Sequence, residues 1–292
     1  MMGSMWLVLC LLVCGCDRVF GLQLPHEGDA SLQFFDAPAD APFACPPIGS
    51  TPQFAVLAHP VISQDCVEYT SSLSAAFGTA YCNGSGGGGS IDEAPVDKTM
   101  TVIPNLVATA STTYLHPRLA PEGDQLFTQR YDASGLAVAI FGRAGAGWTQ
   151  ASVVNHIGTA SVTGAFRFGT PTRGPARRML VTDPGVGPLI YELAFDAGAW
   201  KVDLTHDPVS ELGVPGVLLP PALSPDGLRI LFSVLTNSEI HTMYSDRATI
   251  HDPFRTAVRL VGVPNLSDGF LTEDCARVYF SSVGSVFYVQ QQ

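Results

Sequence analysis

A phrase of thirteen residues occurs twice in this chain without an insertion or a deletion. PALSPDGLRILFS occupies residues 221–233 and PRLAPEGDQLFTQ occupies residues 117–129, with prolines, a leucine and a glycine at matching places. Two weaker copies keep a similar spacing, GFLTEDCARVYFS at 269–281 and GTPTRGPARRMLVT at 169–182. A period of roughly 50 residues constrains the fold more than any single residue, because each repeat must build the same unit.

Each copy combines a turn with two short apolar runs. Pro-Asp-Gly favours a turn, and LRILFSV (228–234) and then IHTMY (240–244) suit strands. Trp148 and Trp200 lie 52 residues apart, each after a turn rich in small residues, which supports the same period. The other copies predict paired strands at 126–131 and 136–141, 178–183 and 189–195, and 277–282 and 285–290.

A unit of this length built from several strands indicates a β-propeller blade. We therefore predict an all-β protein with one propeller domain at 53–292, of five blades, with six blades or an irregular ring as alternatives. The last copy ends after two strands, so residues 52–59 are expected to complete its blade. Residues 53–115 would form a divergent first blade, with strands at 66–72, 77–82 and 100–109, ahead of the recognisable repeats at 116–292.

The repeat resembles that of the TolB-like, WD-repeat-like bacterial propellers. The similar residues are LSPDG (223–227), RILFS (229–233) and an aromatic second strand, and the likeness extends over residues 117–292. It implies a periplasmic or cell-surface propeller that holds a partner at one end of its central channel. The chain departs from the pattern in the copy at 169–182, which lacks Asp-Gly, and in the last copy, where Cys275 replaces Gly; six full blades do not fit.

The N-terminus predicts export to the cell envelope. Residues 5–13 form an apolar stretch too short to span a bilayer, and VCGC (13–16) resembles a bacterial lipobox. We expect residues 1–15 to be a signal peptide, Cys16 to carry the lipid anchor, and residues 16–52 to be a tether rich in Pro, Ala and Asp. The location is then the inner or outer membrane of a bacterium, in the periplasm or at the surface. An ordinary secretory signal peptide is the alternative.

Four cysteines remain after the first three are assigned to the signal and the lipid. An even number in an oxidising compartment suggests two disulfides. Cys66 and Cys82 flank a hairpin-sized segment, which leaves Cys45 to pair with Cys275 and join the tether to the last blade. Four unpaired, buried cysteines are the alternative.

Charge and motifs exclude several functions. The chain has 26 acidic and 15 basic residues and a net charge of −11, so nucleic acid is not an expected partner. The glycine-rich stretches 83–90 and 142–147 precede no helix, which excludes a phosphate-binding loop, and 83–90 is expected to be a loop. No cysteine or histidine spacing predicts a metal site, and no cofactor is expected.

Residues that recur in equivalent turns are interpreted as structural. These are Pro121, Gly123, Pro225, Asp226, Gly227 and Asp274. The sequence His-Asp-Pro also recurs, at 206–208 and 251–253, and is interpreted as turn chemistry between blades and not as a metal site or an acid–base pair.

The sequence therefore favours a lipoprotein whose propeller binds an envelope protein, a peptide or a glycan without catalysis. The alternative is a glycosidase or lyase that uses two carboxylates of the channel. The carboxylates available for that role are Asp65, Glu68, Asp183, Glu192, Glu239 and Asp246.

Overall fold

The computed structural model describes residues 45–292, apart from short internal gaps. The expected signal peptide, Cys16 and most of the expected tether lie outside the described residues. The gaps are at 56–57, 63–65, 73–75, 84–88, 96–100, 108, 110, 146, 155, 158–159, 162–166, 175–176, 184–188, 197–198, 215–220, 237–238, 264–266 and 283–284.

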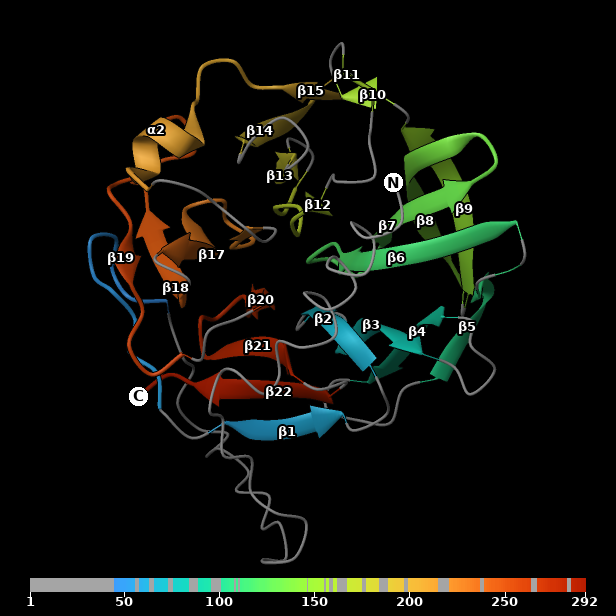
Figure 1. Cartoon of the computed structure of the whole chain (residues 1–292), viewed down its shortest axis with the longest axis horizontal. Helices are drawn as coiled ribbons and strands as arrows, with labels where there is room; N and C mark the ends of the chain where they lie inside the picture. Colours follow the sequence, from blue (N-terminus) through green and yellow to red (C-terminus); the bar gives the residue numbers. More distant parts are fainter. Residues whose placement is uncertain are drawn as a thin grey trace, which may run out of the picture. The chain divides into compact units, whose positions relative to one another are not determined.

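The strands form five four-stranded antiparallel sheets arranged around a ring (Figure 1). Each sheet is a blade whose first strand lies nearest the centre; only in blade 5 does the outermost strand come from the N-terminal side of the chain. The predicted five-bladed propeller is therefore confirmed.

The blades have the following bounds. Blade 1 consists of β2 (Cys66–Ser72), β3 (Phe77–Asn83), β4 (Gly89–Pro95) and β5 (Thr101–Val107). Blade 2 consists of β6 (Thr112–Leu119), β7 (Gln125–Asp132), β8 (Gly135–Ala144) and β9 (Gly147–Val154). Blade 3 consists of β12 (Arg167–Phe168), β13 (Arg178–Asp183), β14 (Leu189–Asp196) and β15 (Ala199–Val202). Blade 4 consists of β16 (Ala222–Leu223), β17 (Arg229–Thr236), β18 (Glu239–Asp246) and β19 (Val258–Arg259). Blade 5 consists of β20 (Ser267–Leu271), β21 (Arg277–Ser282), β22 (Ser285–Gln290) and β1 (His59–Ile62).

Two smaller elements connect the blades. A hairpin of β10 (His156–Ile157) and β11 (Ala160–Ser161) follows blade 2, and helix α2 (Pro208–Leu212) follows blade 3. Proline suits the first turn of a helix because its missing N–H would have no partner there. Asp207 caps this helix by accepting a hydrogen bond from the backbone N–H of Ser210.

The apolar runs of the repeat are continuous because both faces of each strand are buried. In β17, Leu231 packs in a cluster with Val278 of blade 5, whereas Ile230 packs on the opposite face with Leu180 of blade 3. Successive side chains of a strand point to opposite faces, so every central blade needs apolar residues at both odd and even positions. The strands of the repeat therefore contain consecutive apolar residues and not an alternation of apolar and polar residues.

The paired strands expected from the repeats are all present, but two expectations in the divergent part were wrong in detail. Residues 83–90 were expected to be a loop; Gly89 and Ser90 instead begin β4, a strand that the sequence did not predict, and 84–88 lie outside the described residues. GSIDEAP has one β-branched residue, so its propensity for a strand is weak, and pairing with β3 determines its structure.

The strand that closes the ring also differs from the expected 52–59. The chain does run antiparallel to the end of blade 5, but residues 52–55 contribute only the bridge between Phe54 and Gln291, and the ladder with β22 is formed by β1. Phe54 explains the offset, because its side chain is buried in the core between blades 4 and 5. The last residues of the expected tether thus belong to the propeller.

The two ends of the ring are distinguished by their loops. Turns from the first to the second strand, such as 224–229, lie at one end, which we name the turn end. Hairpins from the second to the third strand, such as 132–135, lie at the other, which we name the hairpin end. Because each blade is an antiparallel meander, both kinds of loop keep to their own end.

We predict that Phe54→Ala weakens the closure of the ring. Phe54 is 3% exposed, and truncation of a buried phenylalanine costs about 3–5 kcal/mol of unfolding free energy. Urea unfolding followed by fluorescence measures this change. Leu204→Ala is the control, since Leu204 is 90% exposed and its loss should leave stability unchanged. A loss below about 1 kcal/mol for Phe54→Ala would mean that Phe54 does not hold the closure.

Candidate functional site

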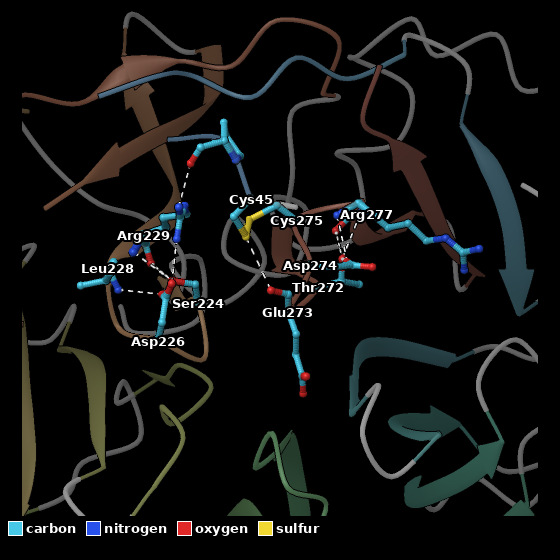
Figure 2. Close-up of a disulfide and its surroundings, with 12 residues drawn as sticks. Cys45, Ser224, Asp226, Leu228, Arg229, Thr272, Glu273, Asp274, Cys275 and Arg277 are labelled. Carbon is cyan, nitrogen blue, oxygen red and sulfur yellow. Dashed lines mark hydrogen bonds and ion pairs between the residues drawn. A yellow bond between two sulfur atoms is a disulfide. The ribbon is translucent and has the colours of Figure 1, made fainter. Parts of the chain in front are cut away.

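The repeated turns of blades 4 and 5 have the same hydrogen bonds. Asp226 Oδ1 accepts from Ser224 Oγ at 2.5 Å and from the Leu228 N–H at 3.0 Å. In blade 5 Asp274 Oδ1 accepts from Thr272 Oγ1 at 2.7 Å and from a backbone N–H at 3.0 Å (Figure 2). The two carboxylates therefore shape their own turns, as expected for an Asx-type turn.

The other two copies keep parts of this pattern. In blade 3 the backbone N–H of Arg178 donates to Thr172 Oγ1 at 2.8 Å, although the loop is one residue longer than in blade 4. In blade 2 the Gly123 N–H donates to the carbonyl of Ala120, the bond that Gly227 makes to Ser224. This shared geometry supports a structural role for the turn residues named in the sequence.

Cys275 occupies the glycine position of its turn. Its φ is 59°, against 70° for Gly123 and 73° for Gly227, a left-handed conformation that a side chain disfavours. Cys275 forms a disulfide with Cys45, and a second disulfide joins Cys66 to Cys82, which face each other on β2 and β3. The structure thus contains the two pairs expected from the sequence.

We predict that glycine at position 275 is more stable than alanine once the disulfide is gone. Cys45→Ala/Cys275→Gly should exceed Cys45→Ala/Cys275→Ala by about 1 kcal/mol in unfolding free energy, because only glycine adopts a positive φ without strain. Chemical denaturation of both variants measures the difference. Gly227→Ala is the matched control and should lose a similar amount. Equal stability of the two double variants would show that the turn at Cys275 is not strained.

Residues that do not repeat connect the turns to one another. Arg173 of blade 3 forms an ion pair of 2.7 Å with Glu273 of blade 5, and its N–H donates to the carbonyl of Pro225 in blade 4. Glu122 of blade 2 accepts from Arg177 at 3.1 Å. Burial raises the pKa of the Glu273 carboxyl in spite of Arg173. Charged side chains at the turn end thus form ion pairs that join different blades.

Two of the candidate catalytic carboxylates are bound by arginines or by the backbone. Glu192 is fully buried and accepts from both terminal nitrogens of Arg247 at 2.8 Å and from Arg178 at 2.9 Å. This joins blade 3 to blade 4. Asp246 is 3% exposed, and its Oδ2 accepts from the Gly49 N–H at 2.6 Å. Neither carboxylate faces another in the part of the chain that the structure describes.

Of three further candidates, the structure describes the side chain of one. Glu239 is exposed at the beginning of β18. Asp65 and the side chain of Asp183 lie outside the described residues.

Glu68 has the setting closest to a functional site. It lies on β2 and pairs with the Nδ1 of His116 on β6, so the pair joins the innermost strands of blades 1 and 2. Each residue has a positive φ, 61° and 52°, and each interrupts the register of its strand. Backbone strain of this kind often accompanies function. His116 was not predicted from the sequence as a site residue, because nothing in the repeat distinguishes it from other strand residues.

Charge keeps the Glu68 carboxyl ionised. Burial alone would raise the pKa of Glu68, but the hydrogen bond and charge of His116, with Arg118 and Arg167, hold the pKa below its usual value. The unfolded chain therefore binds this proton more readily than the folded chain does. The stabilisation is present above the ordinary glutamate pKa near 4.5 and is lost as the pH falls through the folded-state pKa.

We predict a pH-dependent effect of Glu68→Gln. At pH 7 the variant should lose about 3 kcal/mol of unfolding free energy, because it breaks a buried pair. The difference from the wild type should shrink as the pH falls from 4.5 toward 3, because the wild-type carboxylate takes up its proton as the pH falls through the folded-state pKa. Denaturant unfolding at both pH values tests this, with the exposed Glu239→Gln as the control. A gap of the same size at both pH values would exclude the linkage.

The two His-Asp-Pro segments meet at one side chain. Glu211 of α2 lies 3.0 Å from His206 Nδ1 and accepts from the backbone N–H of Phe254 at 3.0 Å. Residues 206–208 lie between blades 3 and 4, as expected, but the expectation for 251–253 was wrong, because this segment lies within blade 4 between β18 and β19.

No group of histidine, cysteine and acidic side chains in the described residues is arranged to hold a metal ion. Nor does any described helix have the length and apolar character needed to cross a membrane. A small cavity of about 10 Å³ lies between blades 2 and 3 and is lined only by apolar residues, among them Phe168, Met179 and Trp200. It has no polar group to orient a substrate.

The hairpin end exposes two large apolar side chains at equivalent positions. Tyr131 ends the second strand of blade 2 and is 58% exposed, and Leu235 ends the second strand of blade 4 and is 46% exposed. They are 104 residues apart, the offset of the two clear repeats. The repeat alignment could have found them by extension beyond its thirteen residues, since both follow the buried part of the strand. Isolated exposed apolar residues are common, but equivalent ones at one end suggest contact with a partner.

The sequence matches no protein-family model and no curated protein sequence. Solved structures similar to the fold include TolB from Acinetobacter baumannii, at 13% identity and a TM-score of 0.47, over 77% of this chain and 54% of that one. They also include the catalytic domain of a GH62 alpha-L-arabinofuranosidase from Coprinopsis cinerea, at 8% identity and a TM-score of 0.54, over 83% and 98%. This chain spans about half the length of that TolB. The class of the protein is a five-bladed β-propeller.

Proposed function

We propose that this protein is a binding module of the bacterial cell envelope, anchored by a lipid on Cys16, without catalytic activity. The hairpin end of the propeller holds a protein, peptide or glycan partner. The observation that carries the proposal is the repeated exposure of Tyr131 and Leu235 at the hairpin end, opposite to the end that residues 45–50 contact.

The outer edges of the blades are poor docking sites. An exposed strand edge can pair with a peptide, and proteins block such edges with proline, bulges or short strands. Pro60 lies in β1, Pro104 lies in β5, and β9 has a bulge where its register shifts. The other two outer strands, β15 and β19, have four and two residues. A partner strand would find little edge to extend.

The turn end is already occupied. Residues 45–50 lie over blades 4 and 5 there, where Pro46 accepts from Arg229 at 2.8 Å and Gly49 donates to Asp246. The ion pair of Arg173 with Glu273 joins blades on either side of blade 4. These contacts all lie at the turn end, which is why we place the partner at the hairpin end.

The glycosidase alternative requires two carboxyl groups on opposite sides of the bond to be cleaved. Glu192, Asp246 and Glu68 are each bound to another partner in the described part of the chain. The likeness to an arabinofuranosidase domain concerns the fold alone. These observations favour binding over hydrolysis.

We predict that Tyr131→Ser/Leu235→Ser abolishes capture of the partner. Crosslinking in intact cells, followed by purification of the lipidated protein and mass spectrometry, identifies the captured molecule. The double variant should lose at least about 90% of the product, since a few large apolar residues usually dominate an interface. Val261→Ser, which also removes an exposed apolar side chain, is the control and should leave capture unchanged.

Two outcomes would contradict the proposed function. Capture that is equal in the double variant and the wild type places the partner elsewhere. Release of sugar from plant or bacterial polysaccharides that is abolished by Glu68→Gln would establish the enzyme instead. The anchor is tested separately, because a Cys16→Ser variant should no longer incorporate a fatty-acid probe.

A further inference from the structure

We propose that the disulfide between Cys45 and Cys275 is a redox-controlled latch on the N-terminal strap, which we define as residues 45–50. Reduction by a dithiol would release the strap from the turn end while the ring stays closed. The inference is independent of the proposed partner and of the lipid anchor.

The Cys45–Cys275 disulfide is more accessible to a reductant than the Cys66–Cys82 disulfide. Cys45 is partly exposed, whereas Cys275, Cys66 and Cys82 are 0%, 1% and 5% exposed. Thiol–disulfide exchange requires a thiolate to reach one sulfur along the axis of the bond. The Cys45 sulfur is therefore the point of attack, and the Cys66–Cys82 bond is shielded inside blade 1.

The exchange balances without a further reactant. A thiolate of the dithiol attacks Cys45 Sγ, and Cys275 leaves as a thiolate that takes up a proton. The second thiol of the reductant then attacks the mixed disulfide and leaves Cys45 as a thiol. The reductant gives two electrons and two protons and becomes a disulfide. The Cys45 sulfur lies 3.5 Å from the carbonyl oxygen of Glu273, so the new thiol has an acceptor at hand (Figure 2).

Besides the disulfide and the packing of Cys45 on the core, two described hydrogen bonds join the strap to the propeller. Pro46 accepts one hydrogen bond from Arg229, and Gly49 donates one to Asp246. The turn of the strap depends on Gly49, whose φ is 90° and whose added Cβ would lie 2.3 Å from Arg255 Nη1. Reduction removes the only covalent contact among these.

The closure of the ring begins after the strap. Phe54 is buried in the core of blades 4 and 5, the Ala55 N–H donates to the carbonyl of Gln290, and β1 pairs with β22. The backbone hydrogen bonds of this closure do not involve Cys45 or Cys275, although Cys275 belongs to the same apolar cluster as Phe54 and Cys45 packs against it. Release of the strap would therefore leave the strand pairing of the closure in place. Arg229 and Asp246 would each lose one contact and remain paired with Asp226 and Arg255.

Stepwise reduction of the purified protein tests the latch. Dithiothreitol is added in increasing amounts, free thiols are alkylated, and both pairs are mapped by mass spectrometry. We expect Cys45–Cys275 to open at least about tenfold faster than Cys66–Cys82, because exchange follows access. Hydrogen exchange should then accelerate at the Gly49 and Ser50 amides and remain slow in β1.

Two variants separate the latch from general unfolding. Cys45→Ser/Cys275→Gly imitates the open latch and keeps a residue suited to the turn, so it should exchange rapidly in the strap and slowly in β1. Gly49→Ala should speed the opening of the disulfide several-fold. Gly145→Ala, at another glycine of positive φ with open space around it, is its control and should have no effect.

Three results would overturn the proposal. The first is that Cys66–Cys82 opens as fast as Cys45–Cys275. The second is that the strap amides exchange no faster after selective reduction. The third is that β1 exchanges together with the strap, since the ring would then open with the bond.

Discussion

Each sheet of this ring is buried on both faces, and the rest of the structure depends on that constraint. Ile230 and Leu231 are neighbours in β17, yet they pack against blades 3 and 5 respectively. A blade therefore lacks half of its core unless a blade stands on each side, and the ring must close. The chain closes it by pairing β1 with β22 and by burying Phe54 beside them.

The charged residues follow the same requirement. Glu192 with Arg247 joins blades 3 and 4, and Glu68 with His116 joins blades 1 and 2. Arg143 of blade 2 stacks on the phenyl ring of Phe77 of blade 1, with its guanidinium carbon 4.2 Å from the centre of that phenyl ring. Paired and buried in this way, the acids lose their availability for substrates. The side chains left to bind a partner are those that do not pair between blades.

The sequence predicted what repeats and missed what does not. The turn at 224–229 and its strands were predictable because local turn chemistry and burial on both faces agree. β4 was missed because its residues have weak strand propensity and are held by pairing with β3. The closing strand was placed too early because Phe54 looks like a strand residue but serves the core. His116 gives no sequence signal, since its partner Glu68 lies on another blade.

Departures from the repeat are where the ring loses its symmetry. Gly123 and Gly227 allow the left-handed turn without strain, and blade 5 gives up that advantage by placing Cys275 there. The replacement of glycine by cysteine has a structural reason at blade 5, because this blade alone receives a strand from the N-terminal side of the chain. Among the described residues, the incoming segment 45–50 contacts blades 4 and 5, and the turn of blade 5 is the one to which it is covalently joined. The replacement of a repeated glycine by Cys275 thus marks the blade at which the N-terminal and C-terminal parts of the propeller chain are joined.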